Sequence, residues 1–372
     1  MSEITDAKFA LYKALKEQTI RRAREDSAIC TQYVLGYKNA SFHNQWHDFI
    51  NKNQSGQILA FRDSGKSEQI TIGRAIWEVG KNPGIRIKVA TETDDLAIKI
   101  LSKISATILK NERYHEVFPK IHPSDIASWN KTSMTVERDQ HHKDPTIEGG
   151  GVLTASTGGR ADLILFDDIS GMRNALYFPR MREQVKESFY NNWLNLLDGP
   201  EARWYMVGTP WHEQDVVSEV RSNKTVPKSV ETWVGDNFES PWPERFPSEY
   251  FKKRLGLLKQ RAYNRAYRGI ALSGDESWIN PSAIEASKDR TLKVYDVLQN
   301  SEISRFTGID LGHRPGEENS PTVIFTIGRT PTGKRIPLDI RKFQQKSILD
   351  TGRVILKVWE ELRPALIFCE NN

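Results

Sequence analysis

Short apolar runs alternate with longer amphipathic stretches along the first part of the chain. Between positions 42 and about 209, five runs rich in β-branched or aromatic residues predict strands, at 57–61, 85–90, 132–136, 163–166 and 204–207. Apolar residues at helical spacing predict one helix over 72–79 and another over 96–108, the second behind Thr93 as a candidate N-cap. Strands that alternate with helices of this length predict a mainly parallel, doubly wound α/β sheet.

The regions on either side of this pattern differ from it. Residues 1–35 are charged and helix-prone, which is typical of either a solvated helix or a helix that docks on a partner. Residues 236–300 hold four prolines and show little alternation, and we interpret them as a linker bearing one helix. From Arg305 a new series of strands follows, with one helix around 347–362. We therefore divide the chain into a helical segment (1–35), a main α/β domain (36–235), the linker (236–300) and a second α/β domain (301–372).

The composition of the chain places only weak limits on its fold and function. A chain of 372 residues favours two domains, and its hydrophobic share of 38% is enough for packed cores. The net charge of +5 permits a polyanionic partner without requiring one. Two cysteines, Cys30 and Cys369, cannot form a disulfide framework or a Cys-based zinc site. No signal peptide or membrane-spanning stretch is visible, so we expect a soluble, intracellular protein without a membrane partner.

The segment 57–67 reads QILAFRDSGKS and leads directly into a helical pattern. A strand, a loop ending in Gly-Lys-Ser and a helix form a phosphate cradle, because backbone N–H groups and the helix N-terminus face the anion. In such a loop Lys66 would reach the β- and γ-phosphates of a nucleotide, and the Ser67 hydroxyl would bind Mg²⁺. Ala60 stands where the common form of the motif has glycine.

The second half of such a site is a strand that ends in carboxylates. Residues 162–168 read DLILFDD, four apolar residues followed by two aspartates. Asp167 would hold the Mg²⁺, and Asp168 would orient or deprotonate the attacking water. The alternative is a buried strand whose aspartates only begin a turn. The order and spacing of this segment relative to the phosphate loop favour the nucleotide site.

These motifs, taken in order, resemble the ATPase domain of bacteriophage terminase large subunits. In that family the phosphate loop has the pattern Arg-x-x-Gly-Lys-Ser/Thr and lacks the first glycine of the common motif. The chain fits this form with Arg62-Asp63-Ser64-Gly65-Lys66-Ser67. Other matching segments are Phe42-His43-Asn44-Gln45, where the family contacts adenine, Gly159-Arg160-Ala161-Asp162 ahead of LILFDD, the coupling motif at Gly208-Thr209-Pro210-Trp211-His212, and Trp242-Pro243-Glu244-Arg245-Phe246.

The resemblance implies a P-loop NTPase of the ASCE type that uses ATP and Mg²⁺. Many such motors carry Glu after the metal-binding aspartate, whereas this chain has the shorter Asp168, which we take as the catalytic carboxylate. Arginine is expected to neutralise charge on the transferred phosphoryl group. Arg62 is the candidate within the loop. Arg160 is the candidate for a finger that acts on a neighbouring subunit, or alternatively forms a surface ion pair.

The resemblance also implies that the second α/β domain is an RNase H-like nuclease with two divalent metals, Mg²⁺ or Mn²⁺. Asp310 would be the first metal ligand and Glu370 the second, and Asp339 is a weaker candidate that could face solvent. The chain ends at Asn372, whereas the family's third carboxylate comes from a later segment. We therefore expect an incomplete nuclease domain with impaired cleavage.

A basic stretch lies inside the predicted linker. Four of its arginines, spaced so that one helix would carry them on one face, suggest either a surface that follows DNA phosphates or a solvated lid helix: Arg254, Arg261, Arg265 and Arg268.

The resemblance predicts an ATP-driven motor that translocates viral double-stranded DNA into a procapsid, together with endonuclease cleavage of concatemeric DNA in the complete protein. Its implied partners are a small terminase subunit that chooses the DNA, a portal protein, and copies of itself in a ring. It would act in the cytoplasm of the infected bacterium, transiently on the procapsid and not in the mature virion. Two alternatives remain. One is another P-loop translocase or helicase, although no helicase motif follows Thr209. The other is an inactive prophage remnant that binds DNA or portal.

Overall fold

The computed structural model describes residues 2–127, 129–140, 142–154, 158–223, 228–271, 287, 298–311, 321–343 and 347–369. Backbone contacts divide the chain into two compact units, Met1–Trp278 and Ile279–Asn372. Each unit is described by itself. Among the described residues, no helix combines the length and the apolar character needed to cross a membrane.

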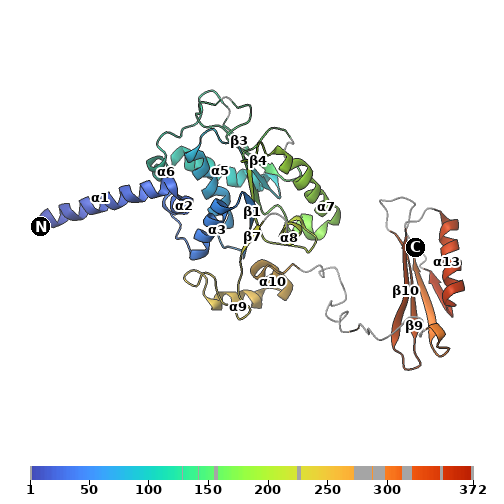
Figure 1. Cartoon of the computed structure of the whole chain (residues 1–372). Helices are drawn as coiled ribbons and strands as arrows, with labels where there is room; N and C mark the ends of the chain where they lie inside the picture. Colours follow the sequence, from blue (N-terminus) through green and yellow to red (C-terminus); the bar gives the residue numbers. More distant parts are fainter. Residues whose placement is uncertain are drawn as a thin grey trace. The chain divides into compact units, whose positions relative to one another are not determined.

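The first unit is built on a seven-stranded sheet in the order β3-β4-β2-β5-β6-β1-β7 (Figure 1). The strands are β1 (Ser55–Ala60), β2 (Ile87–Thr91), β3 (Ser133–Met134), β4 (Ile147–Gly151), β5 (Leu163–Asp167), β6 (Arg203–Gly208) and β7 (Lys228–Thr232). All neighbours pair in parallel except β3 and β4, which are antiparallel. Every residue of β2 and β5 is buried, as in sheets covered on both faces. This sheet confirms the predicted mainly parallel, doubly wound α/β fold.

Helices lie on both faces of this sheet, whereas most of the first helix of the unit projects away from it (Figure 1). The helices of this unit are α1 (Ser2–Glu25), α2 (Ser27–Leu35), α3 (Ser41–Lys52), the π-helix η1 (Ser67–Arg74), α4 (Ala75–Lys81), α5 (Asp94–Lys110), α6 (Glu112–Val117), η2 (Met172–Tyr177), α7 (Pro179–Glu187), η3 (Ser188–Trp193), η4 (Leu194–Leu196), α8 (Val216–Ser222), α9 (Ser248–Leu257) and α10 (Gln260–Arg268). The predicted cap is present, since the Thr93 hydroxyl accepts the Leu96 N–H at 3.4 Å.

Two hydrophobic cores lie on the two faces, and β5 contributes to both. Its residues Leu163 and Leu165 pack with residues of α2 to α6, α9 and α10. The alternate residues Ile164 and Phe166 pack with residues of α7, η3 and α8. This alternation follows from the opposite directions of successive side chains along a strand, and it holds the carboxyl end of β5 rigidly in the middle of the sheet.

The segment after β7 differs from its prediction. Two helices, α9 and α10, replace the single helix expected there, with the break at Leu258 and Lys259. Arg254 therefore lies on a different helix from the other three arginines of the basic stretch, and Arg265 is buried at 7% exposure. The prediction of one arginine-bearing helix face is wrong, because the backbone becomes extended at Leu258 and Lys259, shortly after Gly256, and a new helix begins at Gln260.

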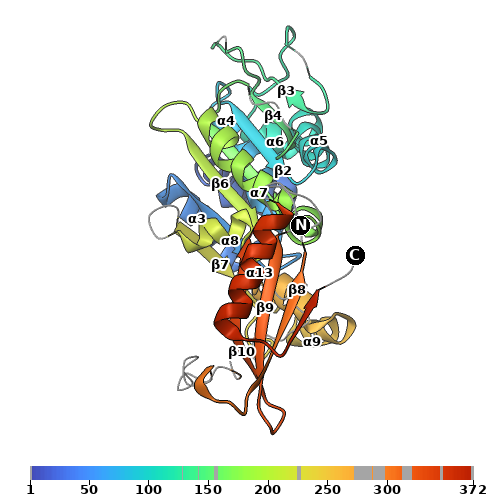
Figure 2. The ribbon, with the colours of Figure 1, turned by 90° about the vertical axis from the view of Figure 1, so that its right-hand side faces the viewer.

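The second unit contains a four-stranded sheet in the order β10-β9-β8-β11. Its strands are β8 (Ser304–Asp310), β9 (Thr322–Arg329), β10 (Arg335–Phe343) and β11 (Leu366–Cys369), and only β11 runs parallel to its neighbour, β8. Figure 2 shows the helix α13 (Ile348–Leu362) along one face of this sheet. Ile309 and Ile324 pack there against Val358 and Leu362.

Candidate nucleotide-binding site

The predicted phosphate loop leaves β1 at the carboxyl edge of the first sheet and enters η1 at Ser67. Asp63 and Gly65 have left-handed backbone angles, with φ of 69° and 88°. Glycine enters this region freely, and aspartate does so more readily than most residues. Alternating left-handed residues let successive N–H groups face one concavity, which is the backbone pattern of anion-binding nests. The loop is therefore shaped to receive a phosphate group.

Lys66 lies at the base of this loop and is 7% exposed. Its Nζ donates to the carbonyl oxygens of Ala60 at 3.0 Å and Phe61 at 3.4 Å, and to Thr209 Oγ1 at 3.3 Å. Thr209 Oγ1 in turn donates to the Ala60 carbonyl at 3.3 Å. The structure thus brings the loop lysine into contact with the predicted coupling motif, which follows β6.

Asp167 ends β5 beside the start of η1. Ser67 Oγ donates to Asp167 Oδ1 at 2.9 Å, and the Thr71 hydroxyl donates to Asp167 Oδ2. Burial and the charge of Asp168 raise the pKa of Asp167 to about 7, against the hydroxyls of Thr71 and Ser67 and the charge of Lys66, which lower it. Hydroxyl and carboxylate oxygens are ligands that Mg²⁺ accepts. The Ser67 and Asp167 oxygens at this position fit such an ion. Sequence reasoning missed Thr71, although its hydroxyl lies one helical turn after Ser67.

Asp168 follows Asp167 in a left-handed conformation with φ of 42°. Its N–H donates to the Val207 carbonyl of β6 at 3.0 Å. Its Oδ1 is buried and has no hydrogen-bond partner within the described part of the chain. A buried carboxylate oxygen without a partner is uncommon in native proteins, so this atom is a candidate for contact with a bound molecule.

His43 connects α3 to the middle of the phosphate loop. Its Nδ1 accepts the Ala40 N–H at 2.9 Å, so the proton lies on Nε2, which donates to the Ser64 carbonyl at 2.7 Å. The ring also packs edge-on against Trp242, with centroids 4.9 Å apart. Of the segment predicted to contact adenine, Phe42 and His43 are thus buried against the loop, whereas Gln45 is exposed on α3.

The two candidate arginines lie far apart. Arg62 is exposed on the phosphate loop, where its backbone N–H donates to the Ala266 carbonyl of α10 at 2.8 Å. Arg160 precedes β5, at the opposite edge of the sheet, and its Nη1 donates to the Asn195 carbonyl at 3.3 Å. The five residues of β5 separate the two edges by roughly 16 Å. Arg160 therefore cannot contact a nucleotide on its own loop.

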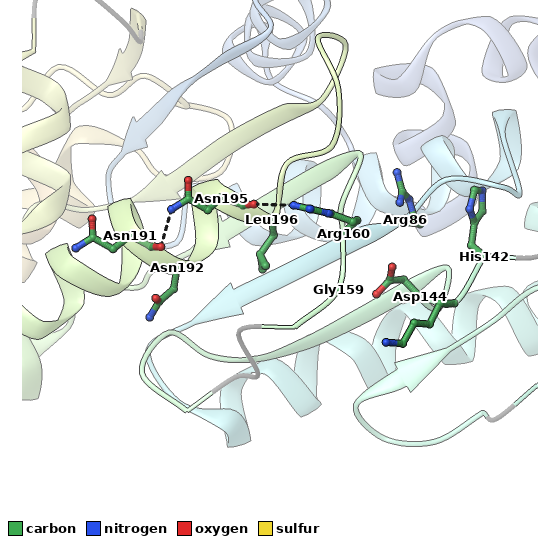
Figure 3. Close-up of a pocket in the computed structure, with 10 residues that line it drawn as sticks. Arg86, His142, Asp144, Gly159, Arg160, Asn191, Asn192, Asn195 and Leu196 are labelled. Atoms are coloured by element: carbon green, nitrogen blue, oxygen red, sulfur yellow. Dashed lines mark hydrogen bonds between the residues drawn. The ribbon is translucent and has the colours of Figure 1, made fainter.

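Arg160 lines a polar cavity of about 640 Å³ (Figure 3). The cavity lies beside the amino ends of three parallel strands, because Arg86 precedes β2, Asp144 precedes β4 and Arg160 precedes β5. Arg86 is already paired, with Asp162 at 2.6 Å and with a second aspartate, Asp198, at 2.9 Å. Arg160 is exposed at this edge, as the predicted role of a finger that acts on a neighbouring subunit requires.

The predicted nuclease ligands are not assembled by the described residues. Asp310 ends β8 and is exposed, and Glu370 lies outside the described residues. Asp339 pairs with Arg341 at 2.8 Å on the edge strand β10, level with Thr307 rather than with Asp310. Within the described ranges, no group of three or more His, Cys, Asp or Glu side chains could hold a metal ion.

A phosphate loop after β1, a buried aspartate at the end of β5 and an extra strand, β6, between them define an α/β P-loop ATPase fold of the predicted ASCE type. No family model matches the chain. The chain is 22% identical to the terminase large subunit of Enterobacteria phage T3 over 218 residues, which is 56% of this chain and 34% of that protein. With the ordered motifs, this match supports the predicted relationship: the chain is related to phage terminase large subunits. The match spans about a third of that relative's length.

Similar solved structures include other phage terminases. The ATPase domain of the Thermus phage P74-26 large terminase has a TM-score of 0.43 and 18% identity, covering 64% of this chain and 96% of that chain. The HK97 bacteriophage large terminase has a TM-score of 0.47 and 13% identity, with 90% and 70% covered. The large terminase of bacteriophage D6E in complex with ADP has a TM-score of 0.38 and 12% identity, with 86% and 73% covered.

Proposed function

We propose that this chain is the ATPase subunit of a phage DNA-packaging motor, which hydrolyses ATP to drive viral double-stranded DNA into a procapsid. The observation that carries the proposal is the meeting of three segments at one edge of the sheet. Lys66 of the phosphate loop contacts Thr209 after β6, and Ser67 of the same loop contacts Asp167 at the end of β5. This arrangement suits a triphosphate with its metal ion, and the sequence match supports the motor function.

Each side chain has a distinct part in the proposed reaction. Lys66 binds the β- and γ-phosphates and offsets their charge. Ser67 and Asp167 hold Mg²⁺, which neutralises charge on the phosphate oxygens. Asp168 faces the attacking water. Arg62 from the loop, or Arg160 from a neighbouring subunit, stabilises the charge that grows on the γ-phosphoryl group.

The contact between Lys66 and Thr209 offers a way to transmit hydrolysis to DNA. A bound triphosphate attracts the Lys66 ammonium more strongly than a hydroxyl does, because the interaction is between opposite charges. Binding and release of the nucleotide would therefore break and remake the bond to Thr209. Thr209 lies at the end of β6, so the change would reach α8 and the segments that follow. In this proposal Gly208 and Thr209 form the coupling motif.

The remaining parts of the proposal follow from the family relationship. The chain would form a ring on a portal protein in the infected bacterium, receive DNA from a small terminase subunit and leave the filled capsid. An RNase H-like nuclease with two divalent metals would include Asp310 and Glu370. Arg160 would face the nucleotide of the next subunit, which agrees with its position at the sheet edge opposite its own loop.

The test is ATP turnover by the purified chain, with and without double-stranded DNA. We expect Mg²⁺-dependent hydrolysis that Lys66→Ala and Asp167→Asn abolish, while both variants keep the wild-type circular dichroism spectrum. Strand displacement from a forked duplex, measured in parallel, identifies a helicase instead. Absence of turnover in the wild-type chain under all these conditions would contradict the proposal and favour an inactive remnant.

A further inference from the structure

Glu92 is an acidic side chain at the same edge of the sheet that the motifs do not reveal. Strand β2 ends at Thr91, which is level with Asp167 of β5, and Asp167 is level with Val207 of β6. The residue after Thr91 is Glu92, the residue after Asp167 is Asp168, and the residue after Val207 is Gly208. These three residues therefore leave the sheet at adjacent positions, at the edge where the phosphate loop lies.

Glu92 and Asp168 share an unusual feature. Glu92 Oε1 and Asp168 Oδ1 are both buried, and neither has a hydrogen-bond partner among the described residues. Leaving a buried carboxylate oxygen unpaired costs free energy. Two such atoms on adjacent strand ends are candidates for hydrogen bonds to a bound polar molecule.

The surroundings of Glu92 hold its side chain in place. Gly171 leaves room for the carboxylate, because a Cβ at this position would overlap with it. Burial raises the pKa of Glu92, and the neighbouring charge of Asp168 raises it further, whereas the Asn174 backbone amide and the Arg173 guanidinium lower it. The contact with Asn174 anchors the carboxylate at the start of η2, and Oε1 remains free.

Asp168 directly follows β5, and its side chain lies near β6. A Cβ on Gly208 of β6 would lie 3.5 Å from Asp168 Oδ1, so this oxygen is turned toward β6. Glu92 extends from β2 and has one more methylene group than Asp168. Glu92 follows β2 and Asp168 follows the neighbouring strand β5, close enough for their charges to interact, beside the proposed metal ligand Asp167.

We propose that Glu92 accepts the proton of the water that attacks ATP, while Asp168 orients that water. The proposal rests on the ATPase function proposed above. As the water oxygen bonds to the γ-phosphorus, its proton moves to a Glu92 carboxylate oxygen. The bond from that phosphorus to the bridging oxygen breaks, which leaves ADP and inorganic phosphate, and the proton on Glu92 then returns to solvent.

The experiment measures single-turnover hydrolysis per bound ATP in Glu92→Gln, so that only folded, nucleotide-loaded protein counts. Glutamine keeps the shape of the side chain and can still accept the Asn174 N–H, but it is not a base. We expect hydrolysis to slow at least 100-fold, on the order expected for loss of a general base, with ATP affinity within threefold of wild type. Asp95→Asn is the matched control, because it removes the same charge from an exposed position three residues later and should leave the rate unchanged.

The outcomes separate this proposal from the ATPase function itself. Hydrolysis by Glu92→Gln within threefold of wild type, beside an inactive Lys66→Ala protein, overturns the role of Glu92 and leaves the ATPase standing. No turnover by the wild-type chain refutes the ATPase. If Glu92→Gln fails to bind ATP, the hydrolysis rate of Glu92→Asp is measured instead. That variant keeps the charge but withdraws the carboxylate by one methylene group. At least a tenfold slower rate per bound ATP supports the proposal, and a wild-type rate overturns it.

Discussion

The Nε2–H of His43 donates to the carbonyl oxygen of Ser64 at 2.7 Å, which joins α3 to the middle of the phosphate loop. Burial lowers the pKa of His43 to about 4, against the Ser64 carbonyl, which raises it, so the ring is neutral at physiological pH. The bond fixes the orientation of the peptide between Ser64 and Gly65. The next N–H of the loop therefore faces the concavity before any phosphate arrives.

Replacing His43 should weaken ATP binding. His43→Leu introduces an apolar side chain of similar bulk and leaves the buried Ser64 carbonyl without this donor, which typically costs about 1 kcal/mol or more. Because that cost falls on the conformation that binds phosphate, we expect the dissociation constant for ATP to rise about tenfold. Isothermal titration with a non-hydrolysable ATP analogue measures it.

A matched variant tests whether the hydrogen bond itself is responsible. In His43→Gln the amide nitrogen can occupy nearly the position of Nε2 and donate to the same carbonyl, so this variant should bind ATP more tightly than His43→Leu. Equal affinities in both variants would show that ring packing against Trp242, rather than the hydrogen bond, shapes the loop.

Buried His47 predicts a pH dependence of stability. Its Nδ1 lies 2.8 Å from Ser27 Oγ and its Nε2 lies 3.2 Å from Gln69 Oε1. Burial lowers the pKa of His47 from 6.5 to about 4 in the folded state. Between these values the unfolded chain binds the proton and the folded chain does not, so stability rises with pH. The contribution is complete above about pH 6.5, is lost as the pH falls toward 4, and does not change further below 4.

We therefore expect wild-type protein to lose up to roughly 1 kcal/mol of unfolding free energy per pH unit through this residue, between pH 6.5 and 4. Urea denaturation of wild type and His47→Gln at several pH values isolates the effect, because other titrating groups are common to both proteins. His122→Gln, at an exposed position, is the control and should follow wild type. Parallel curves for wild type and His47→Gln would contradict the assignment.

Much of the first sheet could be predicted because its strands carry a local signal. The apolar runs that form β1, β5 and β6 are largely buried, and burial on both faces requires apolar residues at successive positions. Strand β4 escaped prediction, since its sequence IEGGG contains three glycines, a residue depleted in strands. Its Gly149 is needed for packing, because a Cβ there would lie 2.7 Å from the Val89 carbonyl oxygen of β2. A local propensity cannot report such a contact between strands.

The candidate site was predictable where adjacent residues in the chain are also adjacent in space. Gly65, Lys66 and Ser67 form one loop, and Asp167 follows an obvious strand. Glu92 was missed because its position beside Asp168 depends on which strands are neighbours and on their register. The resemblance to a known family supplied Arg160 as a candidate finger, but only the fold places it at the opposite sheet edge from its own phosphate loop.

Thr71 should govern metal binding through Asp167. Its hydroxyl is fully buried and donates to the Asp167 carboxylate, whose other oxygen accepts from Ser67. Groups that orient a metal ligand in this way typically change metal affinity or activity 10- to 100-fold when removed. We expect Thr71→Val, which is nearly isosteric, to raise the Mg²⁺ concentration for half-maximal ATP hydrolysis about tenfold. Thr71→Ser keeps the hydroxyl and should resemble wild type. An unchanged Mg²⁺ dependence in Thr71→Val would remove Thr71 from the site.

Arg160 leads to a prediction about pairs of subunits. Because it lies at the sheet edge away from its own phosphate loop, Arg160→Ala should bind ATP as wild type does but fail to hydrolyse it after assembly. Lys66→Ala disables the loop and leaves Arg160 intact. In a mixture of the two proteins, some interfaces pair an intact loop with an intact arginine. Hydrolysis should therefore reappear and peak near equal proportions of the two proteins, as a colorimetric phosphate assay across mixing ratios would show.

The control for this experiment replaces the Arg160→Ala partner with the double variant Lys66→Ala, Arg160→Ala. No interface in that mixture contains an intact loop, so it should stay inactive at every ratio. Recovery there would mean that the activity comes from contamination or from another site. If the first mixture shows no recovery at any ratio, Arg160 does not act across a subunit boundary. Its bond to the Asn195 carbonyl would then be its whole role, and Arg62 in the loop would remain as the arginine that stabilises the γ-phosphoryl group.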